Sequence, residues 1–156
     1  MQRIVSTILI AGVTAIFAFD LFGQGLSPLF GYARLAPVEL AKSTLNAVFG
    51  STPGGSAFLL HAFTGTIAYP LGYFLLARPI QRTVIPNLHW AVTAIVYGVV
   101  LWFFAVYIMA SLVAGLPAFL GWTGITWVAL WGHIVFALVA AWVIEARGLR
   151  FDLINR

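Results

Sequence analysis

Four uninterrupted apolar segments constrain the fold of this chain more than any other feature of its sequence. They cover approximately residues 4–22, 57–77, 88–113 and 122–144. Each is close to the roughly 20 residues that an α-helix needs to cross about 30 Å of hydrocarbon. Lipid offers the backbone no hydrogen-bond partners, so such segments cross a membrane as helices. The sequence therefore predicts an all-α integral membrane protein, with residues 1–156 forming a single domain of four transmembrane helices.

The composition excludes most soluble classes. The chain is 62% hydrophobic and 8% charged, whereas about a quarter of the residues of a soluble domain are charged. The absence of cysteine excludes disulfides, thiolate metal sites and cysteine nucleophiles. With four acidic residues and no HExxH or GxSxG motif, the chain offers little support for an enzyme and no catalytic residues or metal ligands are predicted. No small-x-small cleavage site follows the first segment, which we interpret as a span rather than a signal peptide.

The basic residues predict the orientation. Six basic residues lie next to the segment ends that would face the same side of the membrane: Arg3, Arg78, Arg82, Arg147, Arg150 and Arg156. Arg34 and Lys42 fall on the other side. Cytoplasmic loops carry the excess of Lys and Arg, so both termini are predicted to be cytoplasmic (N-in, C-in). The basic residues form no patch of the kind that binds nucleic acid.

One loop, between the first and second segments, is long. Pro37 is suited to the first position of a helix and Gly50 to its end, which predicts a short helix over residues 37–49. One face of that helix is formed by Val38, Ala41, Leu45, Val48 and Phe49. The pattern predicts an amphipathic periplasmic helix that lies in the outer interface or caps the bundle.

Three ionisable residues lie inside the segments at similar depth. Asp20 follows Arg3 by 17 residues and His61 precedes Arg78 by 17, which places both about 25 Å above the inner boundary. His133 lies about one helical turn deeper. A charge at the bilayer centre costs about 2.5–3.5 kcal/mol or more, so residues of this kind mark candidate functional sites. We predict a polar intramembrane site in which Asp20 and His61 share a hydrogen bond, with His133 close by.

Small residues follow His61 at helical spacing. Gly65, Ala68 and Gly72 form a stripe that lets another helix approach closely, and they are predicted to be helix-packing residues. Pro70 lacks a backbone donor, which predicts a kink in the same segment.

Three classes of function remain open. The first is an accessory or interaction subunit of a membrane assembly, which is favoured by the small size and the absence of any soluble domain. The second is a proton- or solute-handling transporter or channel that uses Asp20 and His61. The third is a carrier of haem b or a chlorophyll-type pigment with His61 and His133 as ligands. The partners expected are the lipid bilayer and other membrane subunits or further copies of the chain.

Three segments carry a resemblance to a known family. The segment His61–Leu76, HAFTGTIAYPLGYFLL, together with residues 12–20 and the later GHIVFALVAAWVI, resembles small four-span bacterial inner-membrane proteins of the YagU-like type. The resemblance implies a multi-pass protein of the bacterial cytoplasmic (inner) membrane. It implies no mechanism.

Overall fold

Four long apolar helices form the molecule, which we describe from a computed structural model covering residues 2–149. Each helix is long and apolar enough to cross a membrane, as predicted: Gln2–Leu29, Ser56–Val84, Trp90–Val113 and Gly124–Ala146. The first is made of α1 (Gln2–Asp20), η1 (Leu21–Leu26) and α2 (Ser27–Leu29). The second comprises α4 (Ser56–Phe63), η2 (Thr64–Ala68), α5 (Tyr69–Gly72), η3 (Tyr73–Ala77) and α6 (Arg78–Val84). The third is α7 (Trp90–Phe103) with η4 (Phe104–Val113), and the fourth is α8 (Gly124–Ala146).

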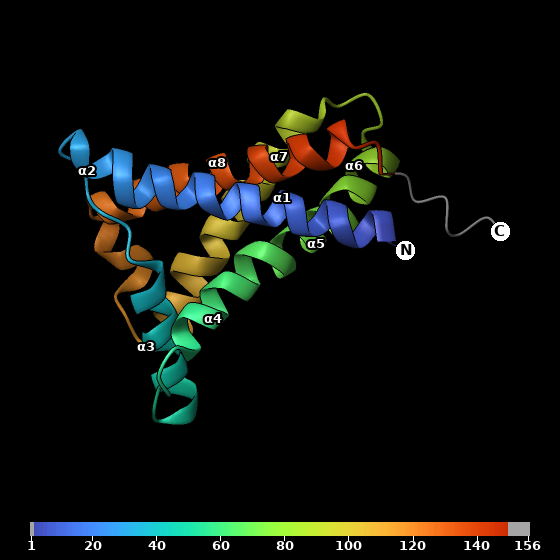
Figure 1. Cartoon of the computed structure of the whole chain (residues 1–156). Coiled ribbons are helices and arrows are strands. Elements are labelled where there is room, and N and C mark those ends of the chain that lie inside the picture. Colours follow the sequence, from blue (N-terminus) through green and yellow to red (C-terminus); the bar gives the residue numbers. More distant parts are fainter. Residues whose placement is uncertain (1, 150–156) are drawn as a thin grey trace.

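The most buried helix is α8, which packs along both α1 and α7. Figure 1 shows α1 and α8 side by side, while α4 runs away from α1 toward α3 (Pro37–Phe49). The four helices therefore spread apart at the end of the molecule where α3 lies. Helix α3 packs against α4 and η4 at this end.

Glycines set the two closest helix crossings. A Cβ atom added to Gly12 of α1 would collide with the backbone carbonyl of Thr66 in η2. One added to Gly98 of α7 would lie 2.7 Å from the Cα atom of Ile134 in α8. Such contacts between backbones are possible only where the side chain is absent, as is common at membrane helix interfaces.

The first helix is longer than predicted. Residues 23–29 continue the helix, whereas the predicted segment ended at residue 22. Gly23 and Gly25 lie in this extension, although glycine lowers helix stability by about 1 kcal/mol. Tertiary contacts compensate: the carbonyl oxygen of Gly23 accepts a hydrogen bond from the Leu35 amide at 2.9 Å. The Ser27 hydroxyl, also buried, donates to the Ala33 carbonyl at 2.8 Å. Asp20 is therefore followed by more helix instead of a loop.

Four stretches have the wider π-helical hydrogen bonding, namely η1, η2, η3 and η4. Segments η2 and η3 flank Pro70, which is buried in α5. π-Helical turns are rare, occur mostly as single turns inside α-helices and are frequent at functional sites. No sequence pattern considered above predicted them.

The short connection before α8 has an unusual backbone. Over η5 (Ala118–Trp122), Phe119, Leu120, Gly121 and Trp122 all have positive φ, between 50° and 70°. A left-handed conformation costs roughly 1–2 kcal/mol for each residue with a side chain. Aromatic stacking offsets that cost, with ring centroids 4.5 Å apart for Phe119 and Trp122 and 5.0 Å apart for Phe119 and Tyr107.

The predicted helix over residues 37–49 is present as α3, and Gly50 ends it with φ of 74°. Its buried face centres on Ala41 and Thr44. Val48 and Phe49, which were assigned to the apolar face, are 57% and 72% exposed. The last turn of α3 therefore extends beyond the bundle.

Candidate functional site

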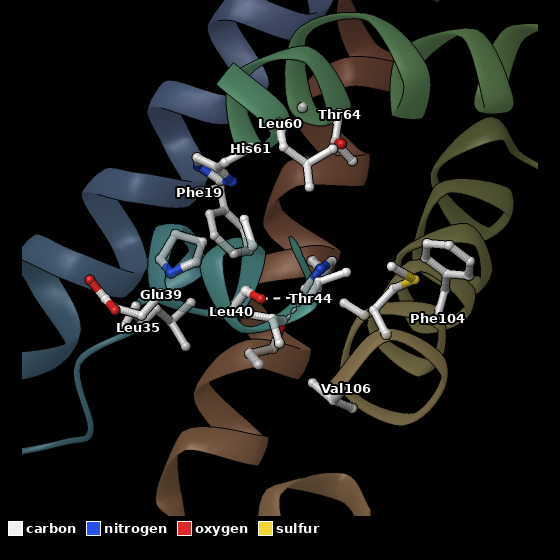
Figure 2. Close-up of a pocket in the computed structure, with 18 of the residues that line it drawn as sticks. Phe19, Leu35, Glu39, Leu40, Thr44, Leu60, His61, Thr64, Phe104 and Val106 are labelled. Atoms are coloured by element: carbon white, nitrogen blue, oxygen red, sulfur yellow. Dashed lines mark hydrogen bonds between the residues drawn. The ribbon is translucent and has the colours of Figure 1, made fainter. Parts of the chain in front are cut away.

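The spreading of the helices leaves a cavity of about 340 Å³ at the end of the bundle covered by α3. Its wall comes from α1, α3, α4, η2, η4, η5 and α8. Figure 2 shows Phe19 and His61 on one side, Phe104 and Val106 on the other, and Leu40 and Thr44 of α3 between them. Most of the remaining wall is aliphatic or aromatic, including Leu35, Leu60, Met109, Leu116, Leu120, Ile125 and Phe136.

His133 contributes a fixed polar atom to this wall. Its side chain lies on α8 and the residue is only 7% exposed. Nδ1 lies 2.7 Å from the carbonyl oxygen of Ala129, one turn earlier in the same helix. A carbonyl oxygen only accepts, so Nδ1 carries the proton and donates. In the neutral ring Nε2 then presents a lone pair, and it has no hydrogen-bond partner among the described residues.

His61 lies on α4 across the site from His133. Its Nε2 atom is 3.6 Å from Oδ1 of Asp20, too far for a hydrogen bond. This nitrogen is buried and has no hydrogen-bond partner within residues 2–149. The site therefore contains a second polar atom that the protein leaves unsatisfied.

The hydrogen bond predicted between Asp20 and His61 is not formed. Oδ1 of Asp20 instead accepts a hydrogen bond from Nε2 of Gln24 at 2.7 Å. Helical continuation through η1 brings Gln24, four residues later, to the same face as Asp20. The Asp20 side chain is 37% exposed, so it also reaches the surface and needs no histidine partner.

Phe19 is the wall residue that the sequence analysis missed. Its ring centroid lies 5.1 Å from that of His133 and 6.3 Å from that of His61, so Phe19 packs near both histidines. Adjacent helical residues point about 100° apart, so Phe19 faces inward where Asp20 faces outward. That relation was available from the sequence, because an outward Asp20 implies an inward neighbour. Gly132 permits the approach, since a Cβ there would lie 3.0 Å from the Phe19 ring.

The part of α3 that faces the cavity was also missed as a site element. Leu40, Ala41 and Thr44 line the cavity, and the Thr44 hydroxyl donates to the Leu40 carbonyl at 3.0 Å. Glu39 lies at the rim with its side chain 72% exposed. An amphipathic pattern shows that a helix has an apolar face but does not show what that face covers.

The three predicted packing residues have different environments. A Cβ on Gly65 would lie 2.6 Å from the end of the Ile16 side chain, and one on Gly72 would collide with the Tyr97 hydroxyl. Ala68 is exposed in the structure, so its predicted role in helix packing stays a prediction. The π-helical turn η2 ends at Ala68 and rotates the following residues relative to α-helical spacing, which displaces Ala68 from the stripe.

The donor set limits the chemistry of the site. The described residues hold no group of three or more His, Asp or Glu side chains able to share a metal ion. No Arg or Lys is among the residues that line the cavity, so no side chain there would neutralise an anion. The site is suited to an uncharged, largely apolar molecule.

Comparison of the chain with protein-family models, curated proteins and solved structures finds no match.

Proposed function

We propose that this protein binds an uncharged lipophilic small molecule in the cavity beneath α3. The observation that carries the proposal is the lone pair of His133 Nε2 on the wall of an otherwise apolar cavity of about 340 Å³. Ligand pockets are typically about 300–1,000 Å³, mostly apolar, with a few placed polar groups. This cavity has those properties.

The cost of leaving polar atoms unpaired supports the same proposal. Nε2 of His61 is buried without a hydrogen bond, and a buried polar group without a partner costs about 1–3 kcal/mol. A stable bundle keeps such atoms where a ligand or water completes their bonding.

We further propose that the cavity lies in the outer half of a bacterial inner membrane, with α3 periplasmic and both termini cytoplasmic. The inner-membrane assignment rests on the resemblance to YagU-like proteins. Hydrogen bonds join Arg3 to the Arg147 carbonyl, and ion pairs join Arg78 and Arg82 to Glu145. These four arginines therefore lie at the opposite end from α3, and an arginine-rich end is typical of the cytoplasmic side. Arg150 and Arg156, which entered the same charge count, lie outside the described residues.

The three predicted functions all stay open beside ligand binding. An accessory role in a larger assembly is compatible with a ligand site, since the two use different surfaces. Proton handling by Asp20 and His61 draws support from their 3.6 Å separation. Each remains a prediction.

Cavity filling tests the proposal. Ala105 lines the cavity and is 8% exposed, so Ala105→Phe would occupy the space from η4. Ala68→Phe adds the same side chain on the exposed face of the second helix and serves as the control. We expect organic extraction and mass spectrometry of the purified protein to find a lipophilic compound at near-equal molar ratio in the wild type and in Ala68→Phe, but not in Ala105→Phe.

A second filling variant, Ala41→Leu from α3, guards against misfolding of the first. Circular dichroism and gel filtration identify which variants keep the native fold. Equal recovery of bound compound from a folded cavity-filled variant and the wild type would contradict the proposal. So would a wild-type protein that carries no compound and binds none of a panel of lipophilic alcohols, phenols and quinones.

A further inference from the structure

We propose that the ligand carries a hydroxyl group on an aromatic ring, as hydroquinones and phenols do, and donates that hydroxyl to Nε2 of His133. This inference rests on the proposed function and narrows it to a chemical class. Three observations support it: the direction of the hydrogen bond between His133 and Ala129, the aromatic side chains beside His133, and the charged residues that line the cavity.

The direction of the hydrogen bond requires a donor on the ligand. Nδ1 of His133 donates to Ala129 at 2.7 Å, and this bond fixes both the ring orientation and the position of the proton. Nε2 of the neutral ring can only accept. A ligand with acceptors alone, such as a ketone, an ether or an oxidised quinone, leaves that lone pair unsatisfied.

The wall beside His133 is suited to a flat ring. Phe19 meets the imidazole edge-on, at 5.1 Å and 75°. Tyr69 lies 6.4 Å from the same imidazole and 5.8 Å from Phe136, again edge-on at 82°. Aromatic groups favour edge-to-face and offset contacts at these separations. An aromatic ligand would extend this arrangement, and aliphatic residues elsewhere on the wall would accommodate an apolar tail.

Charge argues for a neutral ligand. No Arg or Lys is among the described residues that line the cavity, which disfavours carboxylates and phosphates. Glu39 is the one acidic lining residue, and it lies on the exposed rim. A hydroxyl on an aromatic ring is a good hydrogen-bond donor that remains uncharged at neutral pH, as the phenol of tyrosine does.

The test uses two probes of the same size, a decyl-substituted hydroquinone and its oxidised quinone, under anaerobic conditions. The two differ by the hydroxyl hydrogens, so only the hydroquinone donates to Nε2. We expect isothermal titration of the purified protein in detergent to show the hydroquinone binding roughly tenfold or more tightly than the quinone. In His133→Phe, which lacks the acceptor, the two affinities should become equal. In Ala68→Phe, which changes the exposed face of the second helix outside the cavity, the preference for the hydroquinone should persist.

The outcomes separate this inference from the proposed function. Equal affinity of the two probes for the wild type, or a preference that survives in His133→Phe or disappears in Ala68→Phe, would overturn the hydroxyl assignment while the cavity remained a binding site. Binding of neither probe would also overturn it, and the extraction experiment on Ala105→Phe would then decide whether the cavity binds anything.

A Soret band in the purified protein that is lost in His133→Phe would replace the hydroxyl ligand by a tetrapyrrole. If His133→Phe does not fold, the comparison of probes on the wild type decides alone.

Discussion

A single hydrogen bond to a carbonyl one turn away determines what His133 can do. The imidazole of a helical histidine has two nitrogens, and the Ala129 carbonyl fixes which one carries the proton. The remaining nitrogen becomes a directed acceptor in an apolar wall. His61 has no such bond, and its Nε2 atom is 3.6 Å from the nearest carboxylate oxygen of Asp20. Two histidines at similar depth therefore have different chemical capacities.

The prediction for single residues concerns Gly12 of α1. An alanine Cβ there meets the Thr66 backbone, which cannot move aside as a side chain can. We expect Gly12→Ala to destabilise the protein by about 1–3 kcal/mol, the usual cost of overpacking, measured as a lower Tm in detergent.

Gly25→Ala is the matched control for Gly12→Ala. A Cβ on Gly25 would lie 3.5 Å from the Leu21 side chain, an ordinary contact. Alanine also favours helix by up to about 1 kcal/mol over glycine, so Gly25→Ala should be neutral or slightly stabilising. A stable Gly12→Ala would show that α1 and η2 are farther apart than the structure has them.

The residues of the site were partly predictable. Counting residues placed Asp20 and His61 at one level, and their side chains do approach each other. Counting could not fix rotation about the helix axis, and it overlooked the competing Gln24 one turn away. Phe19 was missed because an aromatic residue in an apolar segment is not distinguished by its residue type.

At the scale of elements, helices were predictable but their internal geometry was not. Length and apolarity identified all four long helices, and Pro37 and Gly50 marked the two ends of α3. The sequence gives no such signal for the π-helical turns, because an apolar segment has no polar residues whose spacing would reveal a change in helical register. The exposed position of Ala68 follows from one of these turns.

An ion pair joins the second and fourth helices at the end opposite α3. Arg78 is 3% exposed and contacts Glu145 through two hydrogen bonds, at 2.6 and 3.0 Å. It also donates to the carbonyl oxygen of Leu149. Neutralising Glu145 would leave the buried guanidinium without its charge partner, which costs about 3 kcal/mol or more.

We therefore expect Glu145→Gln to lower the free energy of unfolding by about that amount, measured by denaturation in mixed micelles. Glu39→Gln is the control, because Glu39 is exposed and lies 4.0 Å from Lys42. Exposed pairs contribute about 0–1 kcal/mol, so its effect should be small. Equal effects of the two substitutions would mean that the Arg78 pair is not buried in the folded protein.

For the whole molecule, the exposed surface of the long helices is itself apolar. Phe17, Phe58, Val96 and Trp131 are between 58% and 67% exposed, one on each of the four long helices. Water would not tolerate so extended an apolar surface on a soluble monomer. Lipid tails solvate it without cost, so this outer surface needs no protein partner.

The natural absence of cysteine makes the orientation directly testable. Asn46 of α3 and Thr83 of α6 are both exposed. We expect a membrane-impermeant maleimide to modify Asn46→Cys in intact bacterial cells and Thr83→Cys only after permeabilisation, because the arginine-rich end is predicted to be cytoplasmic.

The reverse labelling pattern would contradict the orientation but leave the four helices in place. Modification of both positions from the same side would contradict the crossing of the membrane by the second helix, which lies between them. The wild-type protein, which has no cysteine, is treated in the same way and gives the background level of maleimide labelling.

The pair between Arg78 and Glu145 also has a consequence for biosynthesis. The two residues are 67 positions apart in the chain. At roughly 5–20 residues per second, the ribosome makes Glu145 about 3–13 s after Arg78. During that interval the growing chain holds an arginine whose protein partner does not yet exist, and only water or lipid phosphates can solvate it. Closure of the bundle by this pair can therefore begin only when translation reaches the end of the fourth helix.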